Sequence, residues 1–209
     1  MPDVSPSLGA PDTWVAALAR ALPALMLGLV ITFSKDHSAS FGLFVFGVFA
    51  VVTGAVLLAS GMRADRSVRG LVLVQGVVTA IAGIAALLLP SGGLGYLVPL
   101  VSAWAILSGS LETVNGIRFR RTRPVARDWL VSGVITVLLG VIFLLVPQNY
   151  IDDYAVEDGA GGVISGAVTA DILLVGVLGA WAIIQGVLLA IAAVSLRTPR
   201  AEKAKTVSA

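Results

Sequence analysis

One carboxyl group lies inside a long apolar run of the chain. Glu112 belongs to SGSLETVNGIR, residues 108–118. Apolar surroundings disfavour the charged form of a carboxyl group, and an ionisable residue inside a membrane is by default a functional candidate. Glu112 is therefore a candidate proton site. Its place near the end of the run favours a structural alternative, a bond to Asn115, Arg118 or surface water.

A short motif recurs three times and places a polar side chain directly before a glycine. The polar residues are Thr53, Ser108 and Gln185, within FAVVTG, WAILSG and WAIIQG. Small polar side chains in membrane helices commonly form hydrogen bonds between helices, each worth about 0.6 to 2 kcal/mol. We favour this packing interpretation. The alternative is that the three polar groups converge on a central axis.

Three further residues carry groups that could take part in chemistry. Arg20 is expected to anchor the first helix at the inner membrane surface by snorkelling, with pairing to Glu112 as the alternative. Gln75 is expected to bond to a neighbouring helix. His37 is the only histidine. Histidine can change charge near neutral pH, but a single histidine in a loop is expected to be merely solvated.

The segment from Tyr150 to Ala170 holds four acidic residues: Asp152, Asp153, Glu157 and Asp158. Paired acids can bind a hard cation, but the calcium-loop pattern is absent, so we expect a solvated acidic loop. The four acids are a candidate contact for a partner protein. Asp171 is expected to cap the helix that follows.

The sequence carries no recognisable catalytic motif. It has no cysteine, one histidine, no phosphate-binding loop and no GxSxG pattern. Without cysteine there can be no disulfide, no thiolate ligand and no thiol nucleophile. We therefore expect a protein that is not an enzyme and that binds neither a cofactor nor a metal ion.

The composition decides which elements position these residues. Hydrophobic residues make up 57% of the 209 residues and charged residues only 12%, and the mean hydropathy is +0.98. Soluble domains carry about 25% charged residues, whereas apolar runs of about 20 residues match a bilayer. Lipid cannot satisfy an open backbone, so each run must be helical. The sequence predicts an all-α, polytopic integral membrane protein with six transmembrane helices: Val15–Phe33, Phe41–Ser60, Leu71–Leu89, Leu94–Ile117, Trp129–Val146 and Ile172–Leu196.

The basic residues predict how the chain is oriented. Thirteen of the fourteen Lys and Arg residues fall on one side of the predicted spans, and Lys35 is the exception. The positive-inside rule makes that side cytoplasmic. Residues 1–13 are then a cytoplasmic N-terminal tail, and residues 197–209 a basic cytoplasmic C-terminal tail. The charges form no basic face on a soluble module, so no nucleic acid partner is expected.

The apolar runs repeat. GVVTAIAGIAALLLP begins at Gly76 and GVITVLLGVIFLLVP at Gly133, and a weaker copy lies 55 residues earlier. We predict one membrane domain, 14–196, of three tandem helical hairpins (14–62, 63–118 and 119–196) with an acidic insertion at 148–170. The repeats are parallel, which predicts a pseudo-three-fold bundle. Glu112 has Leu57 and Leu189 as counterparts, so a symmetric proton path is not expected. Phe49, Trp104 and Trp181 are expected in the core, and Trp14 and Trp129 in interfacial belts.

These repeats resemble the HdeD-like acid-resistance membrane proteins, also called domain of unknown function 308. The resemblance rests on two-helix repeats of about 55 residues, with Gly-x6-Gly-x6-Pro in the first helix, W-x4-G in the second and Arg-rich inner loops. It covers residues 14–196. It implies a six-helix bacterial inner-membrane protein, in a family with a member associated with survival at low pH. It implies no catalytic or binding residues.

The leading hypothesis is a non-enzymatic bacterial inner-membrane protein that contributes to acid or envelope stress tolerance. One alternative is a small transporter or channel for protons or a small solute. Another is a membrane scaffold subunit that binds a partner through its acidic outer loop. The expected surroundings are the lipid bilayer, and either a homo-oligomer or an envelope protein partner is left open.

Overall fold

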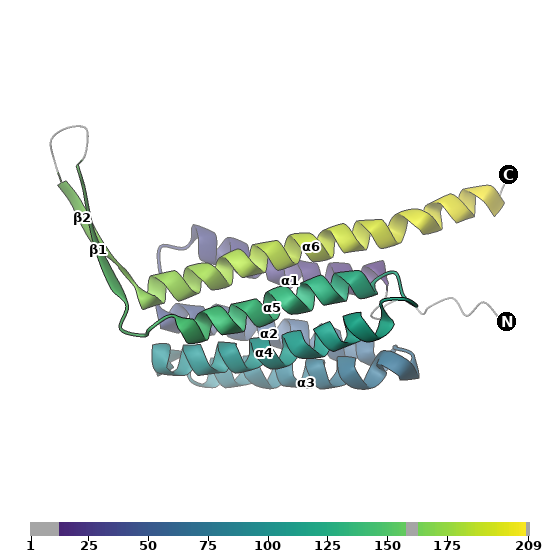
Figure 1. Ribbon diagram of the computed structural model, residues 1–209, viewed down its shortest axis with the longest axis horizontal. Coiled ribbons are helices and arrows are strands. Elements are labelled where there is room, and N and C mark those ends of the chain that lie inside the picture. Colours follow the sequence, from purple (N-terminus) through teal and green to yellow (C-terminus); the bar gives the residue numbers. More distant parts are fainter. Residues whose placement is uncertain (1–12, 158–162, 208–209) are drawn as a thin grey trace.

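The described part of the chain forms six long helices and one β-hairpin (Figure 1). The computed structural model describes residues 13–157 and 163–207, so residues 1–12 of the predicted tail and Asp158 lie outside the described residues. All six helices are long and apolar enough to cross a membrane, which confirms a polytopic α-helical membrane protein. The helices are α1 (Trp14–Phe33), α2 (Ala39–Met62), α3 (Arg66–Leu88), α4 (Leu94–Phe119), α5 (Ala126–Leu145) and α6 (Ala170–Val207).

The boundaries of the helices follow from local sequence. Thr13 and Ser38 accept hydrogen bonds from the first turns of α1 and α2, at 3.4 Å from Ala16 N and 3.2 Å from Phe41 N. Such side-chain caps satisfy amide groups that the helix leaves unpaired. Asp171 was expected to cap its own helix, α6. Instead its Oδ2 accepts a hydrogen bond from the backbone N–H of Ala39, 3.0 Å away, and so joins the starts of α6 and α2.

The helices lie side by side and give the bundle two different ends (Figure 1). The β-hairpin stands at one end, which we call the hairpin end. The opposite end, the basic end, holds the α2–α3 and α4–α5 connections and the C-terminal part of α6. The arginines of the basic end are Arg63, Arg66, Arg69, Arg118, Arg120, Arg121, Arg123, Arg127 and Arg197.

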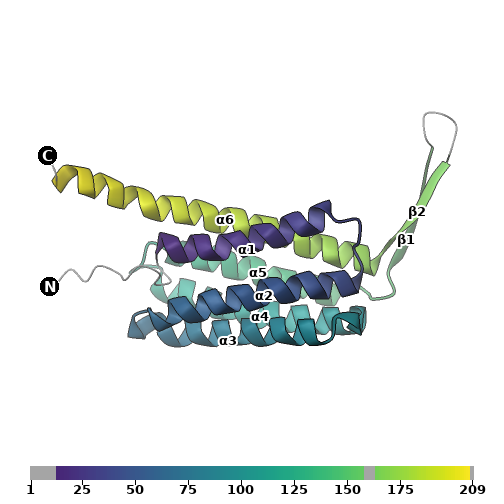
Figure 2. The same ribbon diagram turned by 180° about the vertical axis from the view of Figure 1, so that it is seen from behind.

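Three helix pairs pack more closely than the predicted hairpins do. They are α2 with α3, α4 with α5, and α6 with α1 (Figure 2). Glycines permit this approach: a Cβ added at Gly83 would lie 2.6 Å from the backbone N of Val51, and one at Gly116 would lie 2.5 Å from that of Leu130. The glycine stripes of the repeats therefore join helices of successive repeats, and the α6–α1 pair closes the ring.

The acidic insertion is a β-hairpin rather than the solvated loop that we expected. Strand β1 (Ile151–Glu157) pairs antiparallel with β2 (Val163–Thr169), from Ile151 opposite Thr169 to Glu157 opposite Val163. β2 holds four β-branched residues, and β1 holds Ile151, Tyr154 and Val156, residue types that suit pleated strands. The hairpin projects away from the helices (Figure 1). All residues of β1 are exposed, including Asp152, Asp153 and Glu157.

The interior of the bundle is apolar in the half nearer the hairpin end. We call this region the apolar half. Large side chains from several helices fill it, and Phe46, Leu97, Val101, Leu174, Leu178 and Phe143 are fully buried there. Among the described residues, Ser102 of α4 is the buried polar side chain at this level, and its hydroxyl has no hydrogen-bond partner.

Candidate functional site

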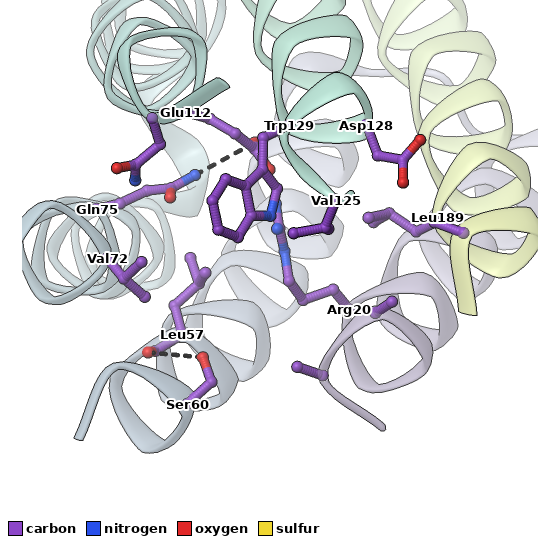
Figure 3. Close-up of a pocket in the computed structure, with 14 residues that line it drawn as sticks. Arg20, Leu57, Ser60, Val72, Gln75, Glu112, Val125, Asp128, Trp129 and Leu189 are labelled. Atoms are coloured by element: carbon purple, nitrogen blue, oxygen red, sulfur yellow. Dashed lines mark hydrogen bonds and ion pairs between the residues drawn. The ribbon is translucent and has the colours of Figure 1, made fainter. Parts of the chain in front are cut away.

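Polar side chains gather in the other half of the interior, nearer the basic end. They line two adjoining pockets of about 20 Å³ each. The rim pocket, closer to the basic end, is lined by Ser60, Asn115, Asp128 and Trp129 among others (Figure 3). The deep pocket lies near mid-bundle. The two pockets share five residues: Arg20, Leu57, Gln75, Glu112 and Leu189.

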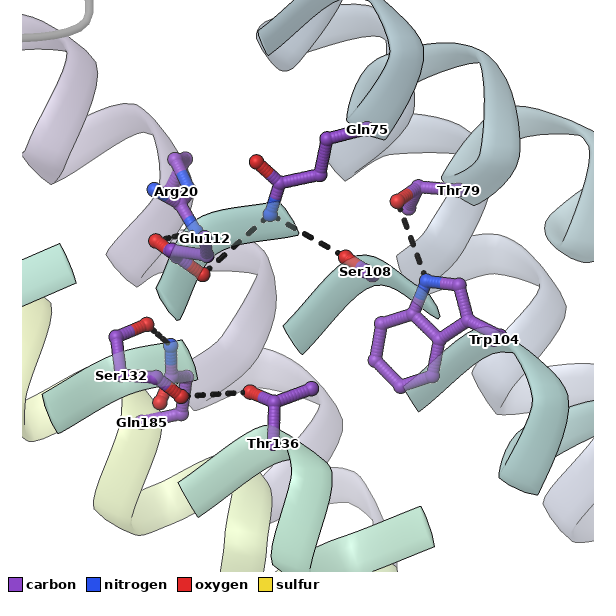
Figure 4. Close-up of polar contacts among 9 residues, drawn as sticks. All are labelled: Arg20, Gln75, Thr79, Trp104, Ser108, Glu112, Ser132, Thr136 and Gln185. Atoms are coloured by element: carbon purple, nitrogen blue, oxygen red, sulfur yellow. Dashed lines mark hydrogen bonds and ion pairs between the residues drawn. The ribbon is translucent and has the colours of Figure 1, made fainter. Parts of the chain in front are cut away.

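A buried ion pair lies where the two pockets meet. Arg20 Nη2 of α1 lies 2.7 Å from Glu112 Oε1 of α4, with 13% and 4% of the two side chains exposed. From α3, Gln75 Nε2 donates to Glu112 Oε2 at 3.4 Å and to Ser108 Oγ at 3.2 Å (Figure 4). Arg20 was expected to snorkel to the membrane surface, and that prediction is wrong. The alternative, pairing with Glu112, is what the structure shows.

Helix geometry explains why Glu112 does not pair with Arg118. The two residues are six positions apart, which places them about 120° apart around a helix of 3.6 residues per turn. Arg118 is exposed and lies over the ring of Phe119, 5.3 Å from its centroid. Glu112 instead shares the inward face of α4 with Ser108 and Asn115, both buried. The carboxylate therefore faces the pockets.

The three polar residues of the repeated motif come together in the deep pocket. Thr53, Ser108 and Gln185 all line it, and all are buried. Ser108 accepts from Gln75, and Gln185 Nε2 donates to Ser132 Oγ of α5 (Figure 4). Thr53 Oγ1 has no hydrogen-bond partner among the described residues. Two of the three thus bond to a neighbouring helix, as the packing interpretation predicts, and all three also line one pocket.

The first helices of the repeats contribute three equivalent residues, of which the sequence pointed to Arg20 and Gln75 but not to Ser132. The 55- and 57-residue periods make Arg20, Gln75 and Ser132 equivalent to one another. All three point into this interior site, from α1, α3 and α5 (Figure 4). The signal was present in the repeat, since each residue directly precedes the first small residue of its copy.

An aromatic cluster closes the deep pocket toward the apolar half. The rings of Phe49, Trp104 and Trp181 meet edge to face, with centroids 5.5 to 6.0 Å apart. Trp104 Nε1 donates to Thr79 Oγ1 at 3.2 Å. These three residues lie in the core as predicted. Trp129 does not lie in an interfacial belt: it is buried and packs with Ala64, Val68 and Val125 at the basic end of the rim pocket.

The remaining candidates lie away from this site. The acids of β1 are exposed on the hairpin, and His37 lies in the α1–α2 connection at the hairpin end. No group of His, Cys, Asp and Glu that could hold a metal ion occurs in the part of the chain that the structure describes. In the α1–α2 connection, Ser38 N donates to Asp36 Oδ1 at 2.8 Å, and this bond holds the pKa of Asp36 below its usual value.

The middle of the chain matches a known protein family. Residues 74–145 match the family model of a short repeat of unknown function, DUF308. This DUF308 region runs from α3 to the end of α5 and contains Gln75, Ser108, Glu112 and Ser132. Arg20, Thr53 and Gln185 come from helices outside it. No curated protein and no solved structure matches the chain.

Proposed function

We propose that this chain is a non-enzymatic inner-membrane protein of bacteria that contributes to tolerance of acid or envelope stress. In this proposal the basic end faces the cytoplasm, as the positive-inside rule predicts. The DUF308 region and the resemblance of the repeats to HdeD-like proteins support the proposal. The observation that carries it is the buried Arg20–Glu112 pair, because a proton can change its charge balance.

Protonation of Glu112 would break the electrostatic balance of the site. A neutral Glu112 leaves the guanidinium of Arg20 without its counter-charge, and a buried unpaired charge is costly. The contact between α1 and α4 would weaken, and Gln75 would lose a charged acceptor. A rise in proton concentration is thereby converted into a change in helix packing. Such a change is what a protein that responds to acid requires.

Acid survival tests this proposal directly. Cells that lack the protein would be complemented with the wild type, with Glu112→Gln or with the control Glu157→Gln, which removes an exposed acid on the hairpin. After an acid shock we expect the wild type and the control to restore survival and internal pH, and Glu112→Gln to fail. Equal rescue by all three would exclude a role for Glu112, and no rescue by any of them would exclude the stress function.

The β-hairpin supports a second candidate function, a membrane scaffold that binds a partner. An isolated two-stranded hairpin is only marginally stable in water, yet this one exposes Val156 by 59% and Val163 by 65%. A partner protein that covered these residues would stabilise the hairpin. The test is crosslinking in membranes from a probe placed at Tyr154. A specific adduct that disappears when residues 151–169 are replaced by a short Gly/Ser turn supports this function, and its absence opposes it.

A transporter or channel is less well supported. A through-path needs groups that replace water along its whole length. In the described residues, the apolar half offers a single buried hydroxyl, that of Ser102, and the aromatic cluster lies between this half and the deep pocket. Solute flux in liposomes that contain the purified protein would reverse this preference.

A further inference from the structure

We infer that Glu112 exchanges its proton only with the basic end of the bundle, through water held in the rim pocket. The site would then respond to pH on that side of the membrane alone. This inference rests on the proposed function, since it takes Arg20 and Glu112 as the functional site. It adds the ligand, a proton carried by water, and the side from which that ligand arrives.

The two pockets have the size and polarity that suit ordered water. A pocket must offer about 10 to 15 Å³ and two to four polar partners to hold one water molecule. Each pocket here measures about 20 Å³. Buried polar atoms without a partner among the described residues line both: Arg20 Nε and Asn115 Oδ1 the rim pocket, and Thr53 Oγ1, Trp181 Nε1 and Gln185 Oε1 the deep pocket. Native proteins rarely leave such atoms unpaired.

The charged groups around Glu112 define the route to it. Arg20 of α1 is its partner, and Asp128 of α5 stands at the rim pocket with its side chain exposed. The other helices packed around the site, α2, α3 and α6, present only uncharged residues to these pockets. On its own helix, Arg118 points away. Asp128 is therefore the exposed carboxylate at the rim pocket, with Arg127 next to it in the chain.

Asp128 also lines a side pocket between α5 and α6. This pocket measures about 130 Å³, and it shares Asp128 and Leu189 with the rim pocket. Arg127 lines this side pocket as well, and with the other arginines of the basic end it repels protons. We assign Asp128 as the carboxylate that receives protons at the mouth against this repulsion, and Glu112 as the residue that binds them inside. When a hydronium ion in the rim pocket gives its proton to Glu112, one hydronium O–H bond breaks, the carboxyl O–H bond forms and a water molecule remains. The charge of the Arg20–Glu112 pair changes from zero to +1.

The route toward the hairpin end is closed. The rings of Phe49, Trp104 and Trp181 contact one another on the side of the deep pocket that faces the hairpin end. Closer to that end, the side chains of Phe46, Val101 and Leu178 are fully buried. Apolar constrictions of this kind exclude water. A proton on Glu112 can therefore leave only by the way it came, and the site binds protons without conducting them.

Infrared spectroscopy of oriented vesicles tests the inference. The purified protein would be reconstituted in two populations, with the basic end either outside or inside. The external pH would be lowered while a lumenal dye reports the internal pH. The band of the protonated Glu112 carboxyl is identified by its loss in Glu112→Gln and its shift in Glu112→Asp, so a folding defect in one variant does not prevent the assignment. Glu157→Gln serves as the unaffected control.

We expect the band at once when the basic end is outside, and only after the lumen acidifies when it is inside. Asp128→Asn should slow its appearance by roughly tenfold. A prompt band from the hairpin side, or no Glu112 band from either side, would overturn the inference. If the Glu112 band appeared at an unchanged rate in Asp128→Asn, the role assigned to Asp128 at the mouth of the pocket would be overturned. A one-sided band in a protein that gives cells no acid protection would refute the proposed function alone, whereas acid protection with a two-sided band would refute this inference alone.

Discussion

The two halves of the bundle interior share one helical scaffold but differ in chemistry. Toward the hairpin end, equivalent positions of the repeats carry Phe46, Val101 and Leu178, all buried and all apolar. Toward the basic end, the equivalent positions of Arg20, Gln75 and Ser132 are polar in all three repeats. The first repeat also supplies the positive charge of the ion pair and the second repeat the negative charge. The glycine-packed helix pairs run through both halves. The scaffold is therefore separable from the site.

The polar half is also where the repeats stop being alike. Arg20 has Gln75 and Ser132 as its counterparts, and Glu112 has Leu57 and Leu189. One charge comes from the first repeat and the opposite charge from the second. A single ion pair on a pseudo-three-fold axis is an arrangement that packing does not require, since the apolar half packs well without one. This asymmetry is the physical reason to place function in the polar half.

Removing one partner of the ion pair should have the largest effect of the changes considered. Arg20→Met leaves the Glu112 carboxylate buried without a counter-charge, which costs about 3 to 5 kcal/mol. The double variant Arg20→Met with Glu112→Leu should recover most of that loss, because apolar residues of similar volume often replace a buried pair. Unfolding by denaturant in detergent measures both. If the double variant were as unstable as Arg20→Met, the polar half would depend on more than this pair.

A glycine contact common to the scaffold tests whether scaffold and site are separable. Gly83→Ala would push a Cβ against the backbone of Val51 and Ala50 and force α2 and α3 apart. Overpacking of this kind costs about 1 to 3 kcal/mol. The matched control is Gly176→Ala in α6, where nothing lies within 4 Å and a gain of about 0.4 to 1 kcal/mol is expected. The same denaturant titration distinguishes the two. A destabilised Gly83→Ala protein that keeps the one-sided infrared band of Glu112 would confirm the separation.

Sequence reasoning predicted the scaffold better than the site. Six helices followed from run length and composition, and the equivalence of Phe49, Trp104 and Trp181 followed from the repeat. The partner of Glu112 did not, because Arg20 lies 92 positions earlier in the sequence and only the packing of α1 near α4 brings them together. The hairpin could not be predicted from periodicity, because the β-branched residues do not alternate in IDDYAVE or VISGAVT and the acids of β1 are typical of a solvated loop. Trp129 was misplaced because its position at a helix end suggests a membrane interface, whereas the fold covers it.

Placing a polar group in the apolar half, or an apolar group in the deep pocket, should change the free energy of unfolding by an intermediate amount. Leu178→Asn places an amide within the apolar core cluster of this half, at a cost of about 1 to 3 kcal/mol if it is left unpaired. Thr53→Val does the reverse in the deep pocket, where the hydroxyl has no protein partner, and should cost less than about 1 kcal/mol. The difference between the two unfolding free energies measures the contrast between the halves. Equal costs would mean that the deep pocket is not hydrated.

Removing the indole hydrogen bond at the boundary should have a smaller effect. Trp104→Phe keeps an aromatic ring against Phe49 and Trp181 but deprives Thr79 Oγ1 of its donor. The loss should be about 0.5 to 1.5 kcal/mol, and the aromatic closure should persist. The one-sided infrared response of Glu112 should therefore survive in Trp104→Phe. A two-sided response in this variant would show that the indole, and not the ring cluster as a whole, closes the deep pocket.

The smallest effect should come from Asp36, whose titration forms a background to that of the interior. Its carboxylate accepts from Ser38 N in the folded state, so the pKa of Asp36 is lower folded than unfolded. The sign of the linkage follows: the stabilisation is present above the unfolded pKa and is lost as the pH falls through the folded pKa. Asp36→Asn should therefore flatten the pH dependence of unfolding slightly, between about pH 5 and pH 2, and leave the Glu112 band unchanged. Part of the pH dependence of unfolding should remain in Asp36→Asn. If that part disappears when Glu112→Gln is added, it comes from the polar half. If Asp36→Asn alone abolished the acid response of unfolding, that response would come from the α1–α2 connection and not from the ion pair.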